Sequence, residues 1–180
     1  MIGRRGLRSV LSTALAALAI LAAVIVLAIL ITARPPAGPL GQVRIDAISV
    51  DFPLPSGQVG TWGNVLPVNP TLEEIKIQEI ELVGVSGLEI EGVSISDPDR
   101  DGGIGTAYGY PPPGVSVKPP SGSVLPSAGA DRPHVQLLVG VQLEGSSEGL
   151  IEAIRVSYEH GGQAYELTMP FSLKAFDPAP

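Results

Sequence analysis

The chain has 180 residues, and its 11 basic and 18 acidic residues give a formal net charge of −7. The first 34 residues hold four arginines and no acid, so the other 146 residues carry 7 basic and 18 acidic residues, a net charge of −11. An acidic body lacks the clustered Lys and Arg of a nucleic-acid-binding surface. The sequence has no cysteine, which excludes disulfides, thiolate metal sites and cysteine nucleophiles.

The N-terminal segment contains 25 consecutive uncharged residues, Ser9–Ala33, most of them Ala, Leu, Ile or Val. As a helix this run is about 37 Å long, enough to cross a hydrocarbon core of about 30 Å. Arg4, Arg5 and Arg8 precede it and only Arg34 follows. The positive-inside rule then predicts that residues 1–8 are cytoplasmic and that the body is extracytoplasmic. We predict a single-pass signal anchor that contacts the lipid bilayer through residues 9–33.

Two other interpretations of the apolar run are a cleaved signal peptide and a buried helix of a soluble domain. A signal peptide has an apolar stretch of about 7–15 residues that ends at small residues. Here the run is longer, and Ile31–Ala33 offers a poor cleavage site because Arg34 and two prolines follow. A helix that is apolar on every face is rare in a single domain of this size. Whether the anchor is cleaved stays open at this point.

The remaining sequence predicts a linker, one domain of strands and a short tail. Residues 34–41 are rich in Pro and Gly and predict a stiff linker spanning about 20 Å. Residues 42–176 alternate apolar and polar side chains with the period of half-buried antiparallel strands, and residues 177–180 form the tail. The apolar stripes are Val43/Ile45/Ala47, Ile48/Val50/Phe52, Ile75/Ile77, Ile80/Leu82, Leu88/Ile90, Val93/Ile95, Val135–Leu143, Ile154–Tyr158 and Tyr165–Leu173.

Breaks in this alternation predict bulges and turns. The phase of the stripes changes near Ala47, between residues 77 and 80, and across Gly92, which predicts β-bulges there. The segment 160–163 has two central glycines that permit a type I′ turn, so the last two strands should form a hairpin. Pro170 indicates an edge strand or a bulge. With a short strand at 62–68, we expect an all-β, immunoglobulin-like antiparallel β-sandwich of about seven strands.

This organisation resembles that of uncharacterised membrane-anchored extracytoplasmic proteins of GC-rich, actinobacterial-like bacteria that have an immunoglobulin-like β-sandwich. The resemblance covers most of the chain, but it is architectural only and rests on no diagnostic motif. It implies a location outside the membrane and assigns no functional residue.

One long loop, residues 97–133, interrupts the strands. It contains eight prolines and seven glycines in 37 residues and has little apolar content. Ordinary connections have about 4–6 residues, and loops of this length are usually functional or disordered. We allow one short strand within it, at residues 115–117.

The loop begins with Asp97-Pro98-Asp99-Arg100-Asp101-Gly102, which matches the first half of a calcium-binding loop. In such loops, residues 1, 3 and 5 supply oxygens and a glycine at position 6 permits the turn. The twelfth position is Tyr108 instead of Glu, and no flanking helices are predicted. Asp97, Asp99 and Asp101 are therefore candidate calcium ligands, and the alternative is an acidic turn at a strand end.

The second candidate site is Tyr108 and Tyr110, which precede three prolines. Tyrosines beside a polyproline stretch can form a flat surface for a partner. The alternative is a stiff loop whose tyrosines pack against the sandwich.

Other chemistry-bearing residues have simpler interpretations. His134 and His160 lack a neighbouring nucleophile motif. Met169 falls on the apolar side of a strand, which argues against a copper site. The alternating Glu79, Glu81, Glu89 and Glu91 mark the solvent side of a sheet instead of a paired-carboxylate active site. Trp62 is expected in the core.

The sequence therefore predicts a non-catalytic, membrane-anchored binding or structural module of the cell envelope, with an envelope protein as its partner. Two alternatives remain. One is a calcium-dependent adhesion or envelope-stabilising domain, and calcium is the only cofactor that we consider. The other is an accessory subunit of a larger membrane complex, for which Ala14, Ala17 and Ala22–Ala23 would permit close helix packing.

Overall fold

The computed structural model describes residues 35–178, and the chain from Pro36 onward forms one compact unit. The predicted signal anchor, residues 9–33, lies outside the described residues. Within residues 35–178, neither helix has the length and apolar character needed to cross a membrane.

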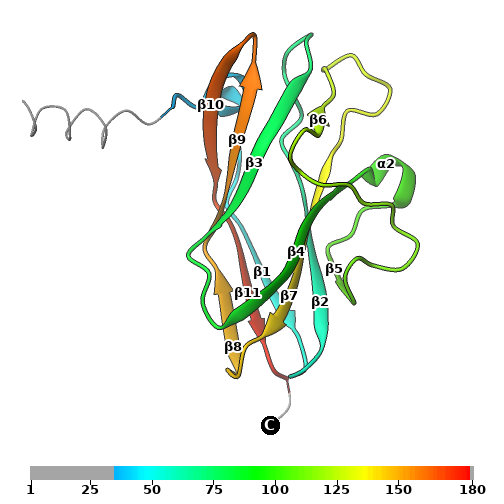
Figure 1. Ribbon diagram of the computed structural model, residues 1–180, viewed down its shortest axis with the longest axis vertical. Helices are drawn as coiled ribbons and strands as arrows, with labels where there is room; N and C mark the ends of the chain where they lie inside the picture. Colours follow the sequence, from blue (N-terminus) through cyan, green and yellow to red (C-terminus); the bar gives the residue numbers. More distant parts are fainter. Residues whose placement is uncertain (1–34, 179–180) are drawn as a thin grey trace, which may run out of the picture. The chain divides into compact units, whose positions relative to one another are not determined.

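The described residues form eleven strands and two short helices, arranged in three hydrogen-bonded sheets (Figure 1). The helices are η1 (Pro39–Gln42) and α2 (Pro98–Asp101). The strands are β1 (Ile48–Pro53), β2 (Val59–Val65), β3 (Ile75–Val83), β4 (Leu88–Ser96), β5 (Thr106–Tyr108), β6 (Val124–Leu125), β7 (Gln136–Leu143), β8 (Glu148–Ile151), β9 (Ala153–His160), β10 (Gln163–Met169) and β11 (Phe171–Phe176). The strand orders are β1-β11-β8, β10-β9-β3-β6 and β4-β7-β2-β5.

The first two of these sheets continue one another. Only Glu152 separates β8 from β9, and only Pro170 separates β10 from β11. The pairing passes from Ile154 opposite Met169 to Ile151 opposite Leu173, which leaves one extra residue on the side of Pro170. Proline has no N–H to donate to the ladder, and the break lies where the sequence predicted an edge strand or a bulge.

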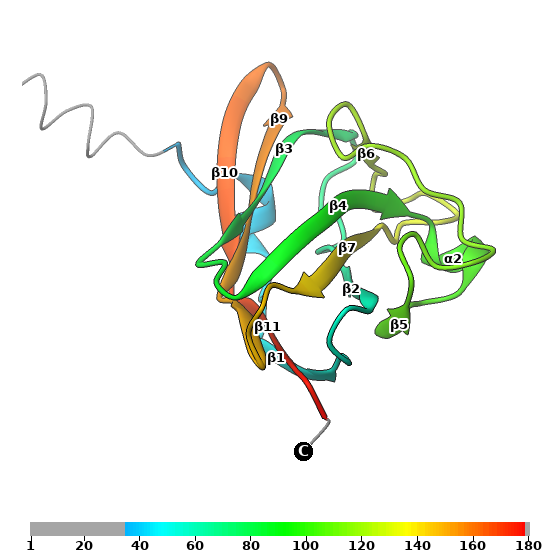
Figure 2. The same cartoon turned by 60° about the horizontal axis from the view of Figure 1, so that its bottom comes forward.

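The β4-β7-β2-β5 sheet packs face to face with this layer, so the fold is a β-sandwich (Figure 2). Alternate side chains of both layers point inward and form one apolar core. Its members include Trp62, Leu137, Val139 and Val141 from one layer and Ile77, Ile154, Val156, Met169 and Leu173 from the other. Trp62 and Met169 are fully buried, as predicted.

Several local predictions are confirmed. His160 pairs with Gln163, and Gly161 and Gly162 have φ angles of 58° and 76°, so β9 and β10 form the predicted hairpin. The register shifts between Ile77 and Glu79 and again between residues 90 and 92, where two of the three bulges were predicted.

Other predictions are wrong. β1 pairs with β11 in parallel, so the sandwich is not wholly antiparallel; a period-two pattern does not reveal the direction of a neighbouring strand. β1 begins at Ile48 and not at Val43, and β2 occupies residues 59–65 and not 62–68. Eleven strands replace about seven, because two long strands are interrupted and the long loop contributes β5 and β6. No strand forms at residues 115–117.

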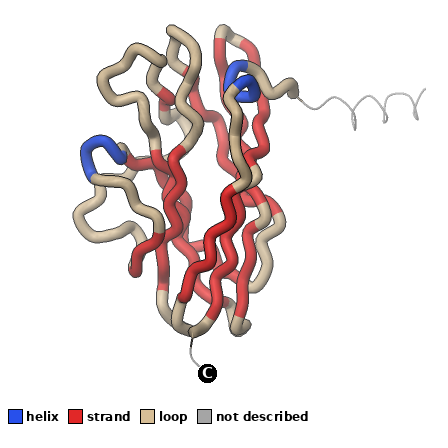
Figure 3. Tube along the Cα trace, turned by 180° about the vertical axis from the view of Figure 1, so that it is seen from behind, coloured by secondary structure: helices blue, strands red, loops and turns tan. Residues whose placement is uncertain are grey.

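Residues 36–42, most of them predicted as linker, pack against β9 and β10. Leu40 is buried, and its N–H donates to the Tyr158 hydroxyl at 3.1 Å. The same hydroxyl donates to the carbonyl of Ala37, and the Glu166 N–H donates to the carbonyl of Pro36 at 3.1 Å. Burial raises the pKa of Tyr158 above its ordinary 10.0. Figure 3 shows η1 at the same end of the sandwich as the β9–β10 hairpin.

Candidate functional site

The long loop, residues 97–133, is folded onto the outer face of the β4-β7-β2 sheet. Thr61, Gly140 and Gly92 lie side by side across this face. A Cβ at Gly140 would overlap the ring of Tyr110, and a Cβ at Gly92 would lie 2.6 Å from its Cε1. The two glycines therefore provide the space in which the Tyr110 ring packs.

Hydrogen bonds fix the loop at a second point. The Gln136 amide accepts from the N–H of Ile104 at 3.0 Å and donates to its carbonyl at 2.6 Å. The Gly63 N–H donates to the carbonyl of Gly105 at 2.8 Å, and β5 then pairs with β2. The alternating pattern of β7 predicted that its polar side faces solvent. That prediction is wrong, because Gln136 and Gly140 are both buried.

The acidic turn predicted to bind calcium forms the single-turn helix α2. Asp97 caps it, because its Oδ1 accepts from the N–H groups of Asp99 at 3.0 Å and Arg100 at 3.2 Å. Gly102 follows the helix with a φ of 83°, which favours glycine. The sequence Asp-Pro-Asp-Arg-Asp-Gly thus has a local structural explanation at both ends of the turn.

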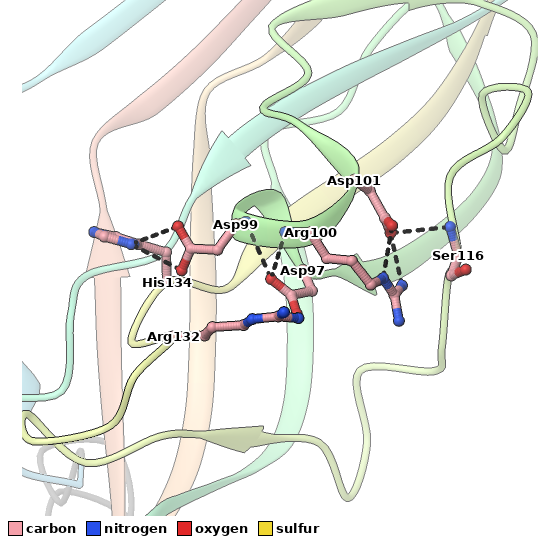
Figure 4. Close-up of polar contacts among 7 residues, drawn as sticks. All are labelled: Asp97, Asp99, Arg100, Asp101, Ser116, Arg132 and His134. Carbon is pink, nitrogen blue, oxygen red and sulfur yellow. Dashed lines mark hydrogen bonds and ion pairs between the residues drawn. The ribbon is translucent and has the colours of Figure 1, made fainter.

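The three carboxylates of the turn contact three different side chains, two arginines and a histidine (Figure 4). The pairs are Asp97 Oδ2 with Arg132 Nη1 at 3.4 Å, Asp99 with His134 Nδ1 at 3.1 Å, and Asp101 with Arg100 Nε and Nη2 at 2.7 Å each. Asp101 also accepts from the Ser116 N–H at 3.1 Å. The hydrogen bond with Arg100 lowers the pKa of Asp101 below its ordinary 3.8 and raises that of Arg100.

These contacts bear on the calcium prediction. Calcium takes about six to eight oxygens that converge on one point. Asp97, Asp99 and Asp101 instead point to separate partners, and residues 35–178 contain no group of three or more His, Asp or Glu side chains arranged to hold a metal ion. A calcium ion would have to displace these partners, and the site stays a prediction.

A pocket of about 280 Å³ opens beside α2. The basic side chains on its wall are Arg100, Lys118, Arg132 and His134, and Asp97 is its one acidic residue. Ser96 also lines it. The end of β4, the loop and the start of β7 build this pocket, so residues far apart in the sequence meet there.

The two candidate tyrosines have different environments. Tyr110 packs on the glycines described above, as the structural alternative predicted. Tyr108 is 57% exposed, its hydroxyl donates to the carbonyl of Pro53 at 3.3 Å, and its ring lies 6.1 Å from that of Phe52. The two tyrosines therefore lie in different environments, and Tyr108 is the more exposed of the two.

Sequence reasoning missed Lys118, Arg132 and Ser96 as members of one cluster. No local motif joins them, since their proximity depends on how the loop folds back to β4. The signal that was present is compositional: three of the seven basic residues after residue 34 fall between residues 100 and 132. His134 joins the cluster, whereas His160 lies in the hairpin turn.

No protein-family model matches this sequence, and no curated protein matches it either.

Proposed function

We propose that the protein is a non-catalytic binding module of the cell envelope, held at the membrane by residues 9–33. In this proposal the long loop is the part that meets the partner. The observation that carries it is the packing of the loop on the β4-β7-β2 sheet, which gives an otherwise irregular segment a fixed shape.

The domain in this proposal is immunoglobulin-like. If β8 and β9 are taken as one strand, and β10 and β11 as another, seven long strands remain. Their orders are then β4-β7-β2 in one layer and β1-β10/β11-β8/β9-β3 in the other. Immunoglobulin domains likewise divide about seven strands between two packed sheets, which supports this part of the proposal. Such domains commonly use end loops for binding, and fold likeness alone assigns no ligand.

The membrane location rests on the sequence. The uncharged run of residues 9–33, with its basic flank on the N-terminal side, supports a signal anchor. The sandwich begins at Pro36, so few residues separate the predicted anchor from the folded body.

A non-catalytic role is supported by the one His–Asp pair of the loop. His134 contacts Asp99, but no hydroxyl or amine of residues 35–178 forms a hydrogen bond with its ring. A nucleophile and its base normally lie within hydrogen-bond reach of each other.

The proposal is tested by photo-crosslinking in the source cell. A photoreactive residue replaces Tyr108 in one variant and, as a control, the exposed Ser147 of the β7–β8 connection in another. We expect a discrete adduct from position 108 that position 147 does not give, in the membrane fraction. Recovery of the protein from the soluble fraction, or the same adducts from both positions, would contradict the proposal.

A further inference from the structure

The pocket beside α2 differs in charge from the rest of the chain after residue 34. Its wall carries Arg100, Lys118 and Arg132 together with His134, against the single carboxylate of Asp97. The body as a whole has 18 acidic and 7 basic residues. A concave site whose charged side chains are mainly basic, on an acidic protein, favours an anionic ligand.

Each of the three side chains that contact the acidic turn is held in place and keeps at least one ring or guanidinium nitrogen free. Arg100 uses Nε and Nη2 on Asp101 and leaves Nη1, and Arg132 uses Nη1 on Asp97. His134 contacts Asp99 through Nδ1; because a carboxylate only accepts, the proton lies on Nδ1 and Nε2 is free. The carboxylates thus act as positioning groups for the cations.

Lys118 is fixed by its backbone and not by an ion pair. Its N–H donates to the carbonyl of Ile95 at 3.0 Å, and its carbonyl accepts from the Ile95 N–H at 2.8 Å. Among residues 35–178, no carboxylate forms an ion pair with its ammonium group, as the ion pairs of that region show. Lys118 therefore presents a positive charge at the pocket wall with no direct ion-pair partner among the described residues.

A second observation at this wall is an unsatisfied hydroxyl. Ser96 lines the pocket and is 4% exposed, and its Oγ is buried with no hydrogen-bond partner among the described residues. Buried polar groups are normally paired, so this unpaired hydroxyl on a lining residue requires an explanation, and a ligand bound in the pocket would be one.

We propose that this pocket binds the phosphate group of a small phosphate ester. A phosphate offers several oxygens and up to two negative charges, which suits guanidinium and ammonium donors that approach from different segments. The pocket lies in the loop to which the proposed function assigns binding, so the inference rests on that function and names a ligand class for it.

The test is calorimetric titration of the full-length protein in a non-ionic maltoside detergent. The probes are inorganic phosphate, glycerol 3-phosphate and glycerophosphoglycerol, with sodium acetate at matched ionic strength as the control anion. Lys118→Gln is the test variant. Lys76→Gln is its control, because Lys76 is an exposed lysine of β3 that lies outside the pocket. Circular dichroism checks that both variants are folded.

We expect saturable binding of a phosphate ester that weakens at least about tenfold in Lys118→Gln, because the variant loses a charge-assisted hydrogen bond to the phosphate. Lys76→Gln should bind as the wild type does. Preference for glycerol 3-phosphate supports a soluble phosphomonoester, and equal binding of glycerophosphoglycerol supports a lipid headgroup as the source. The proposal is overturned if no phosphate compound binds, or if Lys118→Gln and Lys76→Gln bind the phosphate ester equally well. Such a result would not affect the crosslink expected from position 108. The phosphate pocket and the binding-module function can therefore be rejected independently of each other.

Discussion

The outer faces of the two layers differ, although both come from strands with the same alternating pattern. Where the loop lies on β2, β4 and β7, several outward positions hold small residues, among them Thr61, Gly140 and Gly92. On β3, β9 and β10 they hold charged residues that remain in solvent. There Arg155 lies between Glu81, at 2.6 Å, and Glu166, at 3.5 Å.

Leu138 shows the consequence of this difference. It alternates with the core residues Leu137 and Val139 and therefore points away from the core, yet it is 0% exposed. A leucine at the same kind of position on β9 would be in water. The lesson is that a period-two pattern identifies a strand, whereas the size of its polar-side residues indicates whether something packs on that side.

The largest expected effect comes from removing the ring that covers the glycine face. We expect Tyr110→Ala to lower the free energy of unfolding by about 3 kcal/mol, because a large aromatic side chain leaves a cavity over Gly92 and Gly140. Glu81→Ala on the open face breaks only an exposed ion pair and should cost less than about 1 kcal/mol. Urea unfolding of both variants measures the difference, and equal losses would contradict the comparison.

The second-largest effect on stability is expected from adding a side chain to the sheet beneath the Tyr110 ring. Gly140→Ala places a methyl group against the Tyr110 ring, and we expect a loss of about 2 kcal/mol from overpacking. Gly103→Ala is the matched control, because a Cβ there meets no atom within 4 Å. Thermal unfolding of the pair gives the measurement. A Gly140→Ala protein as stable as Gly103→Ala would mean that the loop does not rest on the sheet.

Much of the fold could be predicted from the sequence where the information is local. The Gly161-Gly162 turn and the bulges near residues 78 and 91 depend on neighbouring residues, and all were predicted correctly. The parallel pairing of β1 with β11 depends on residues more than a hundred positions apart. No local pattern encodes it, and it was missed.

The candidate site was less predictable for the same reason. The acidic turn was correctly identified as a turn, but its partners Arg132 and His134 lie 35 residues away along the chain from the aspartates that they contact. Carboxylates spaced as in a calcium loop can instead contact basic side chains. The sequence does not show which of these two roles the aspartates have. Glycines on the polar side of β4 and β7 were the available signal that the loop would pack there.

A smaller effect tests the other attachment in the molecule, where residues 36–42 meet β9 and β10. We expect Tyr158→Phe to cost about 1 kcal/mol, because the buried N–H of Leu40 loses its acceptor. The raised pKa of Tyr158 gives this difference a pH dependence. The neutral phenol is favoured by folding, so its stabilisation is complete below pH 10.0 and is lost as the pH rises through the folded-state pKa.

The measurement is the urea midpoint of both proteins from neutral pH to above pH 10.0. The advantage of the wild type should narrow at the alkaline end, and a constant difference would show that the hydroxyl is not the group responsible. Compared with Tyr110→Ala, this substitution should leave the loop packed, because it acts on hydrogen bonds at one end of the sandwich and not on the covered face.

The smallest expected effect is that of calcium on the covering loop. Because Asp97, Asp99 and Asp101 contact separate cations, we expect identical unfolding midpoints in several millimolar calcium and in a chelator. A site with a dissociation constant tenfold below the calcium concentration would add about 1.4 kcal/mol to the stability. A rise of that size in the wild type, absent from Asp99→Asn, would show that the ion displaces His134 and that the turn binds calcium. The loop would then be held on its sheet by a metal as well as by the Tyr110 ring, and the two outer faces would differ in chemistry as well as in covering.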